Sequence, residues 1–525
     1  MVGLLFSAGA DTLRWRLCLG RWSGAPVLPD VRVTFAGGNP VATGAHFWST
    51  ASVRSTRQKV VLLSANRCTT PDPVFPLGLT CLSAALNGAG YETRWLDVQL
   101  DTDTLEQALK EFRPDAVGIS LRNIDDILIR KRETFFGELA ALVRRVKAAW
   151  SCPVVLGGSG FSVFPQRLLD LSEADFGIQG EGEAGLLALL EALRAGAGFA
   201  NVPGLVHRIG THIVVNPQQP GPLSSPTTSA DRPTRVVSHY LSTSGMLNIQ
   251  TQRGCAHTCC YCTYPLIEGH SHRRRPPEEI AEDFAQIEAQ GARYAFVVDS
   301  IFNSSQAHIV DTCEALLRRR LAIKWGCFLR PEGLTAELMS LMQRAGLAHA
   351  EFGSDSFCDP VLLEYGKRFS FDDVLQASLA ARSAKVDYCH FLIAGGPGET
   401  PETLEEGYRN SLLLPGAVIM AVVGMRIYPG TGLHRRALRE GRINADADLL
   451  EPNYYLAPGL TTEAVFAQLH SFAQRSPNWI AGDPVPGYDR LIQRLRSRGV
   501  LGPLWSYFAV LQRLTTMPGS GVSTA

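Results

Sequence analysis

Short apolar segments alternate with amphipathic stretches and polar loops through most of the 525 residues. In the first half, the apolar segments are rich in β-branched and aromatic residues, which is typical of buried strands. They cover residues 59–64, 91–97, 116–120, 153–156 and 174–178, and helical spacing covers 77–89, 104–112 and 139–150. This alternation predicts an α/β fold, a doubly wound parallel sheet of the Rossmann-like type.

The alternation returns after residue 245, where six further strand candidates each precede a polar loop and a helix. They lie at 246–252, 294–299, 322–328, 349–356, 388–393 and 418–423. Six such units predict a partial (β/α)6 barrel, whose ligands bind at the carboxyl ends of the strands. Helical spacing at 462–474 and 488–498 predicts a small, mainly helical carboxyl-terminal segment.

Composition divides the chain into five parts. Residues 1–58 show no periodicity and are expected to be a poorly ordered extension, followed by an α/β domain at 59–205, a proline-rich linker at 206–245, the barrel at 246–445 and the last segment at 446–525. Lysine and arginine total 50, as do aspartate and glutamate, so charge gives no reason to expect nucleic acid. No apolar run reaches the length of a transmembrane segment, and twelve cysteines without secretory context favour the reducing cytoplasm.

Cys255, Cys259 and Cys262 follow the first barrel strand at C-x3-C-x2-C spacing. Thiolates select zinc or iron–sulfur clusters, and three of them are one short of a closed four-ligand site. An open position is typical of a reactive centre. The alternatives are a disulfide, which the missing secretory context disfavours, and a structural zinc site. The fourth zinc ligand would come from Cys260, His257 or His270.

With Tyr261 before the last cysteine, the loop resembles the cluster loop of radical S-adenosylmethionine (SAM) enzymes. Four later motifs support this resemblance: D-S-x-F-N at 299–303, E-F-G-S-D-S at 351–356, G-G-P-G-E-T at 395–400 and Y-P-G-T-G-L at 428–433. It implies that the three cysteines hold a [4Fe–4S] cluster, that SAM binds its fourth iron, and that Tyr261 lies against the adenine.

The same resemblance implies that Arg330, Glu351, Gly353 and Ser354 hold SAM's polar groups, and that the backbone near Gly395 and Gly396 lies beside the adenine. For Glu351, a buried ion pair with Arg330 is the alternative interpretation. Glu268, six residues after Cys262, is a further candidate to approach the open iron.

The first α/β domain resembles the cobalamin-binding domain that precedes many radical SAM cores. The resemblance implies cobalamin contacts from the loops at the carboxyl ends of the strands, at Ser120, Arg122, Asn123, Gly157, Gly158, Ser159, Gly180, Glu181 and Gly182. No histidine occurs between His46 and His207, so the domain lacks the usual cobalt ligand. Arg67, Val74, Phe75 or a water is then expected at the lower face of cobalamin.

Together these resemblances identify the chain as similar to cobalamin-dependent, class B radical SAM enzymes. Most of these are methyltransferases that move a methyl group from methylcobalamin to an unactivated carbon after 5′-deoxyadenosyl-radical hydrogen abstraction. The resemblances also imply an external one-electron donor such as flavodoxin or ferredoxin. The substrate, a small molecule, lipid or peptide, is not specified. The alternatives are a non-methylating enzyme for cyclisation, ring contraction or oxidation, and a non-catalytic cobalamin or metal sensor.

Overall fold

The computed structural model describes residues 57–507 except 70–71, 222, 224–230 and 482–493. The predicted extension thus lies outside the described residues apart from its last two positions. The same holds for most of the helix expected at 488–498 and for the end of the chain. No helix of the described part is long and apolar enough to cross a membrane.

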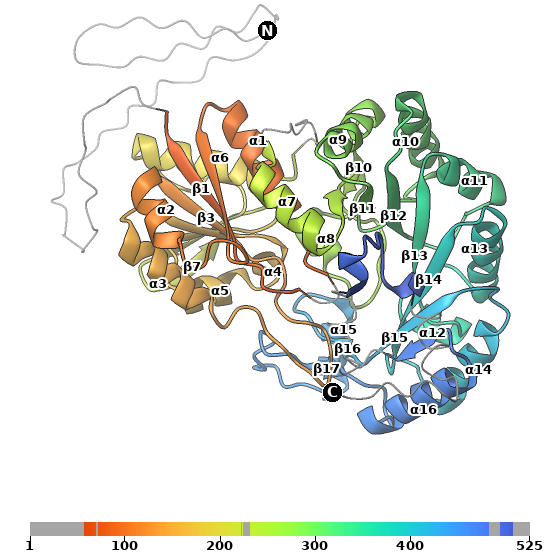
Figure 1. The fold of residues 1–525 in the computed structure, drawn as a ribbon. Coiled ribbons are helices and arrows are strands. Elements are labelled where there is room, and N and C mark those ends of the chain that lie inside the picture. The colour runs from red at the N-terminus through yellow and green to blue at the C-terminus, as the bar shows by residue number, and fades with distance from the viewer. Residues whose placement is uncertain (1–56, 70–71, 222, 224–230, 482–493, 508–525) are drawn as a thin grey trace, which may run out of the picture. The chain divides into compact units, whose positions relative to one another are not determined.

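The first sheet has the order β2-β1-β3-β4-β5-β6-β7 (Figure 1). Its strands are β1 (Lys59–Ser64), β2 (Glu92–Asp97), β3 (Ala116–Ser120), β4 (Val154–Gly157), β5 (Phe176–Ile178), β6 (Leu205–Ile209) and β7 (His212–Val215). The five predicted strands are present and parallel, which confirms the doubly wound fold. The hairpin β6–β7 pairs antiparallel with β5, so the sheet extends past residue 205 into the predicted linker.

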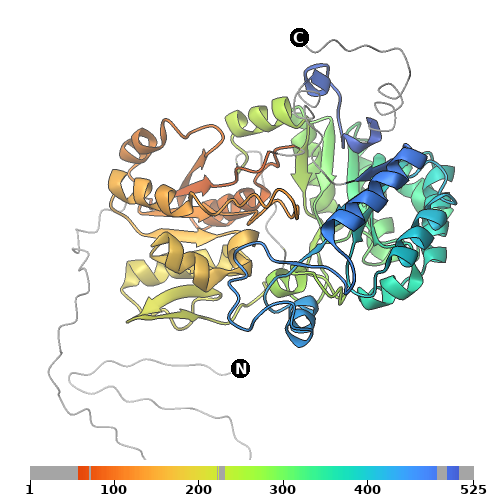
Figure 2. The same ribbon diagram turned by 90° about the horizontal axis from the view of Figure 1, so that it is seen from below.

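Helices cover both faces of this sheet (Figure 2). They are α1 (Leu77–Gly88), α2 (Leu105–Phe112), α3 (Leu139–Ala149), α4 (Ser159–Val163), α5 (Pro165–Ser172) and α6 (Gly182–Ala195). On β1, Val60 and Leu62 belong to one hydrophobic cluster, and Val61 and Leu63 belong to another. Because successive side chains point to opposite faces, a strand buried on both faces is a continuous apolar run.

The second sheet has the order β18-β15-β14-β13-β12-β11-β8, and all neighbouring pairs are parallel. Its strands are β8 (Leu247–Ile249), β11 (Tyr294–Val297), β12 (Lys324–Leu329), β13 (Leu347–Asp355), β14 (Asp387–Ala394), β15 (Val418–Val423) and β18 (Trp479–Ala481). The six predicted strands are confirmed. The sequence analysis missed the seventh, β18, because three residues are too few to show a period.

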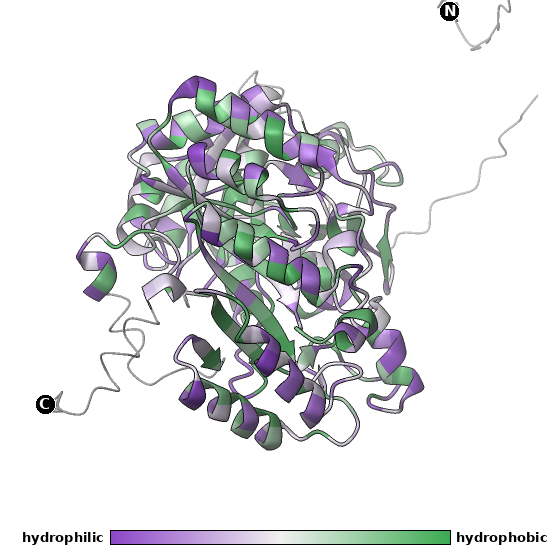
Figure 3. Cartoon of the chain, turned by 90° about the vertical axis from the view of Figure 1, so that its right-hand side faces the viewer, coloured by the Kyte–Doolittle hydropathy of each residue, from purple (hydrophilic) through white to green (hydrophobic). Residues whose placement is uncertain are grey.

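Helices enclose this second sheet (Figure 3). They are α8 (Tyr264–Glu268), α9 (Pro277–Ala289), α10 (Gln306–Arg319), α11 (Ala336–Arg344), α12 (Asp359–Glu364), α13 (Phe371–Ser383), α14 (Pro401–Ser411), α15 (Gly432–Arg439) and α16 (Thr462–Arg475). Two short antiparallel pairs complete the domain, β9 (Gln252–Arg253) with β10 (Arg273–Arg274), and β16 (Met425–Arg426) with β17 (Tyr454–Tyr455).

One helix, α7 (Thr234–Thr243), lies within the predicted linker. The Tyr240 hydroxyl donates to the Asp97 carboxylate at the end of β2 (2.8 Å), and Arg235 pairs with Asp101 (2.8 Å). Val236 and Val237 are buried in the same cluster as residues of both sheets. This segment therefore packs against the first domain, which proline content alone did not indicate.

Candidate active site

The cysteine loop leaves β9 and returns through β10, and these two strands close its base. Gly254 has a φ of +85°, and a Cβ there would lie 2.1 Å from the Ser271 carbonyl oxygen, so the turn requires glycine. The Glu268 carboxylate accepts hydrogen bonds from the Gly254 N–H (3.0 Å) and the Gln250 side-chain amide (3.3 Å). Both oxygens of Glu268, the candidate for the open iron, are therefore engaged at the base of the loop.

The three predicted cluster ligands lie together on this loop. Cys255 is buried, and Cys259 and Cys262 are partly buried. Burial raises the pKa of the Cys255 thiol and raises that of Cys262 to about 12, and neighbouring cysteine thiolates act in the same direction. Desolvated thiolates that repel one another need a compensating positive centre, and a metal centre supplies one.

The chemistry of three thiols on one loop fits an iron–sulfur cluster. Within the described residues, no three His, Cys, Asp or Glu side chains converge on a single metal ion. Each thiolate of an iron–sulfur cluster binds a different iron atom, so such a cluster does not require three donors to converge on one atom. All eleven cysteines of the described ranges are free thiols, which removes the disulfide alternative there. The donor set therefore fits an iron–sulfur cluster.

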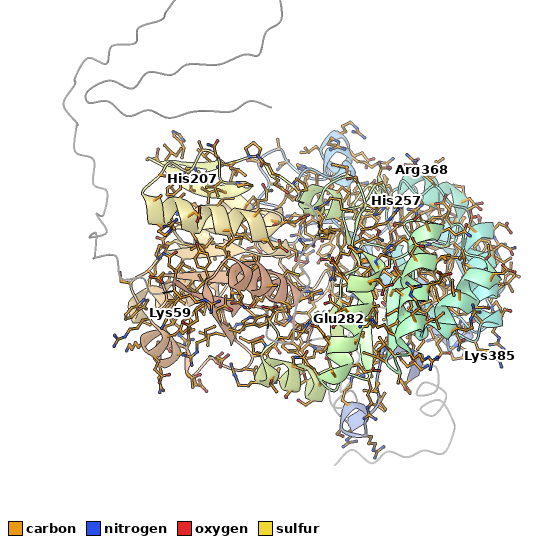
Figure 4. All side chains as sticks on the ribbon, turned by 90° about the horizontal axis from the view of Figure 1, so that it is seen from above. Lys59, His207, His257, Glu282, Arg368 and Lys385 are labelled. Atoms are coloured by element: carbon orange, nitrogen blue, oxygen red, sulfur yellow. The ribbon has the colours of Figure 1, made fainter. Side chains whose placement is uncertain are left out.

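The alternative ligands serve other contacts. The Cys260 sulfur lies 3.9 Å from the Met425 sulfur, and its backbone N–H donates to the Tyr365 carbonyl (2.9 Å). The His257 ring packs edge-on against His272, with ring centroids 5.8 Å apart. Burial first, and then Arg330, His272, Lys367 and Arg368, lower the pKa of His257 to about 4; Figure 4 labels His257 and Arg368.

Strand β13 carries three of the predicted SAM contacts, but on two faces of the sheet. Glu351 and Gly353 alternate with Phe352 and Ser354. The Ser354 hydroxyl contacts His390 Nδ1 (2.7 Å), and His390 Nε2 contacts Ser378 of α13 (3.1 Å). The Ser354 side chain therefore faces the helices, opposite to the side of Glu351 and Gly353. Only its backbone remains for a ligand inside the barrel.

Arg330 and Glu351 are not an ion pair, so that alternative interpretation was wrong. Arg330 pairs with Glu332 (3.0 Å), and its guanidinium lies 5.2 Å from the centre of the Phe369 ring. Glu351 Oε1 accepts a hydrogen bond from Trp505 Nε1 (2.8 Å). Burial raises the pKa of the Glu351 carboxyl to about 7.

A group that the sequence analysis missed connects the cysteine loop to β13. The Tyr261 hydroxyl donates to Asp355 (2.5 Å), which also pairs with the buried Lys367 (2.5 Å). Lys367 Nζ donates to the Gly353 carbonyl (3.3 Å). Asp355 belongs to the same E-F-G-S-D-S motif, but alternation does not place it, because the pairing of β13 with β14 shifts register between Phe352 and Asp355 and Asp355 has a φ of +63°. Tyr261 is thus held at the carboxyl end of β13.

The glycines after β14 have little free space. Gly395 has a φ of +92°, and its N–H donates to the Glu399 carboxylate. The Gly396 N–H donates to the Tyr365 hydroxyl (3.1 Å), from which an added Cβ at Gly396 would be only 2.3 Å away. These contacts fix the backbone turn that the resemblance places beside the adenine.

In the first domain, the loops after β3 and β4 lock together. Gly158 has a φ of +95°, and a Cβ there would lie 2.5 Å from the Leu121 carbonyl oxygen and 2.8 Å from Ser120 Oγ. The Leu121 N–H donates to the Gly157 carbonyl (2.9 Å), and the Ser159 hydroxyl donates to the Arg122 carbonyl (2.9 Å). The predicted cobalamin contacts of these two loops are therefore one connected surface. The Arg122 and Asn123 side chains also hydrogen-bond to each other (2.8 Å).

We expect Gly158→Ala to destabilise the protein by about 1–3 kcal/mol, since the substitution adds both left-handed strain and overlap with backbone atoms. The same substitution should also weaken the retention of cobalamin. Gly198→Ala is the matched control, because a Cβ there meets nothing within 4 Å. Urea unfolding and cobalamin content after desalting measure both effects. Equal midpoints for the two variants would contradict this account.

The loop after β1 fits a polar ligand at one position. Asn66 is 3% exposed, and neither its side-chain oxygen nor its nitrogen has a hydrogen-bond partner. A buried amide without partners is costly and is typical of a ligand contact. Arg67 pairs with Glu138 on the surface (2.7 Å). Phe75 is buried against the Trp95 and Tyr240 rings, so it belongs to the core.

The loop after β5 contacts the cysteine-loop hairpin directly. Glu181 pairs with Arg273 and with Arg253 (3.4 Å), and Glu183 pairs with Arg253 (2.7 Å). Gly180 has a φ of +83°, which favours glycine, and a Cβ there would lie 2.4 Å from the Gln218 side-chain oxygen. A cavity of about 180 Å³ lies here, lined by residues of α1, α6 and β9. The loop that carries the predicted contacts at Gly180, Glu181 and Gly182 thus contacts Arg253, which precedes Cys255 by two residues.

A second contact between the domains comes from the loop after β3. Asp125 forms a buried ion pair with Arg426 (2.8 Å), which also donates to the Leu449 carbonyl (2.9 Å). The Arg130 guanidinium lies 3.6 Å from the centre of the Phe466 ring of α16. The sequence analysis missed this contact, since a loop gives no periodic signal.

Comparison with known proteins agrees with this architecture. The B12 binding domain family matches residues 64–190, and the Radical SAM superfamily matches residues 249–409. The chain therefore carries a B12-binding domain followed by a radical SAM domain.

Particular relatives span most of the chain. The tryptophan 2-C-methyltransferase of Streptomyces laurentii is 26% identical over 430 residues, which are 69% of this chain and 72% of that enzyme. The hopanoid C-3 methylase of Methylococcus capsulatus is 27% identical over 369 residues, 68% and 67% of the two chains. The structure of the radical S-adenosylmethionine methyltransferase TsrM from Kitasatospora setae, with cobalamin and a [4Fe–4S] cluster bound, matches with a TM-score of 0.78. It covers 87% of this chain and 98% of that chain at 24% identity, which confirms the fold.

Proposed function

We propose that this chain is a cobalamin-dependent radical SAM C-methyltransferase that acts on a small molecule. The observation that carries the proposal is the direct contact between the two domains at the cysteine loop. Glu181 and Glu183 of the B12-binding domain bind Arg253, which precedes Cys255 by two residues. Two cofactor sites joined in this way can serve one reaction.

The residues fit the three cofactors. Cys255, Cys259 and Cys262 would hold a [4Fe–4S] cluster. Tyr261, Arg330, Gly353 and the Gly395–Gly396 turn would surround SAM, and Asn66, Arg122 and the loops at 120–123 and 157–159 would contact cobalamin. When bound, these groups supply one-electron cleavage of SAM, hydrogen abstraction and a transferable methyl group. The chain's own residues bind and orient the cofactors and exclude water.

The B12-binding domain would leave cobalt without an imidazole. Its described part contains no histidine before His207, whose ring packs against Phe199 on the edge strand β6. Arg67, held by Glu138, is the candidate at the lower face. An external one-electron donor such as flavodoxin or ferredoxin would reduce the cluster. A cytoplasmic location suits thiols that must stay reduced to bind a cluster.

A product assay tests the proposal. The anaerobically reconstituted protein, given SAM, methylcobalamin, a reductant and candidate substrates, should form both S-adenosylhomocysteine and 5′-deoxyadenosine. A non-methylating enzyme would form 5′-deoxyadenosine without S-adenosylhomocysteine. Failure to assemble a cluster of about four irons would favour a sensor and contradict the enzyme.

A further inference from the structure

One face of the second sheet lines the inside of the barrel. Residues paired across neighbouring strands project to the same face, and the register pairs Phe328 with Glu351 and Phe391 with Met420. Phe296 pairs with Gly326, two residues before Phe328 on β12. The opposite face packs on the helices, as the His390 contact with α13 shows. Phe296, Phe328, Glu351 and Phe391 therefore share the inner face.

The inner face leaves apolar surface uncovered. Phe296, Phe328 and Phe391 are only partly buried, whereas Phe352 on the opposite face is fully buried. The Phe296 and Phe328 rings meet edge to face with centroids 5.0 Å apart, and Phe328 and Phe391 are 6.5 Å apart. A Cβ added at Gly353 would meet no atom within 4 Å. We call the open space that these residues border the chamber, and its wall is aromatic.

The carboxyl-terminal segment closes the other end of this chamber. A Cβ on Gly502 would lie 2.9 Å from the His349 ring and 3.1 Å from the Tyr294 ring, so the chain passes directly over them. The Trp505 ring packs against His349 at 5.6 Å, and its N–H donates to Glu351. These contacts form a floor at the amino-terminal ends of β11 and β13.

Glu351 is the polar group of this chamber that remains available. Its Oε1 accepts from Trp505, and its Oε2 accepts no hydrogen bond from any described residue. Asp355, on the same strand, is already engaged by Lys367 and Tyr261. Four residues separate the two acids, which is at most about 13 Å along a strand, and β13 has a register irregularity between them. Glu351 is thus well below the level where the cysteine loop meets β13.

We infer that this chamber binds the substrate, and that the substrate is a small aromatic molecule with a nitrogen-bound hydrogen that Glu351 accepts. The inference rests on the proposed function and names the substrate class of the same site. Rings pack edge to face against the three phenylalanines, and a buried carboxylate requires a donor or cation as partner. Glu351 is then a substrate contact, in place of the SAM contact that the resemblance implied.

Calorimetry with 2-phenylethylamine tests the inference on the full, anaerobically reconstituted chain. We expect binding that Glu351→Gln weakens at least about tenfold, since it removes a charged acceptor and keeps the shape and the Trp505 contact. The saturated analogue 2-cyclohexylethylamine should bind at least about threefold more weakly. SAM affinity should stay within about twofold of wild type in Glu351→Gln. Asp387→Asn, an acid at the exposed start of β14, is the control and should bind like wild type.

Two results would overturn the inference: no binding of 2-phenylethylamine, or a Glu351→Gln variant that loses affinity for SAM and keeps the amine. Phe391→Leu keeps the test valid if Glu351→Gln fails to fold, and should weaken the amine about three- to tenfold. Binding is measured without turnover. Missing reaction products therefore contradict the proposed function, whereas unchanged amine affinity contradicts this inference alone.

Discussion

Cys255→Ala should reduce the iron content of the reconstituted protein from about four atoms per chain to near zero and abolish SAM cleavage. Cys255 is the one buried cysteine of the three ligands. Its backbone N–H donates to the Gly269 carbonyl (3.1 Å), which fixes its position on the loop. Two remaining thiolates cannot hold a cluster against their own desolvation and repulsion. Iron analysis, the broad visible absorbance of the cluster and 5′-deoxyadenosine formation measure the effect.

Cys260→Ala is the matched control for this experiment. Cys260 lies on the same loop, but its sulfur contacts Met425, and its role in the loop depends on backbone hydrogen bonds that alanine keeps. Iron content and SAM cleavage should stay near those of the wild type. A Cys255→Ala protein that still cleaves SAM would show that the ligand assignment is wrong.

Arg426→Ala should lower the free energy of unfolding by about 3–5 kcal/mol, because it leaves Asp125 as an uncompensated buried charge. The side chains of this pair are 4% and 0% exposed. The substitution also removes donors to the Leu449 and Leu450 carbonyls. Since Asp125 belongs to the B12-binding domain, the two domains should separate at lower denaturant concentration. Urea unfolding followed by circular dichroism gives the change in midpoint.

Arg167→Ala provides the comparison. Arg167 of α5 pairs with Asp448 (3.0 Å), so this ion pair also joins the B12-binding domain to the segment near residue 448. Its side chains are 50% and 46% exposed, and exposed pairs contribute about 0–1 kcal/mol. Similar losses of unfolding free energy in Arg426→Ala and Arg167→Ala would mean that burial of the Asp125–Arg426 pair has no energetic consequence.

The strands and the cysteine loop could be predicted because their physical signals are local. The run from Val60 to Leu63 is apolar because both faces of β1 are buried, and a loop of three cysteines has few chemical explanations. The B12-binding and radical SAM domains expected from these patterns are confirmed by the matching families.

The contacts between distant segments could not be predicted in this way. The Trp505 hydrogen bond to Glu351 joins residues 154 positions apart, and no period in the sequence records it. The face of Ser354 was decided by a histidine on the next strand and a serine on α13. Motif resemblance places residues along a strand, whereas neighbouring strands and helices decide which side chains reach a ligand.

The carboxyl-terminal segment also sets the order in which the protein can assemble. Arg496 pairs with Asp72 (2.6 Å), 424 residues away, and the side chains are only 4% and 10% exposed. Closing a loop of this length costs roughly 5 kcal/mol of chain entropy, so the pair can form only after most of the intervening chain is folded. During synthesis, Asp72 therefore leaves the ribosome 424 residues before its partner Arg496. The floor of the barrel, which includes Trp505, is completed at the same late stage.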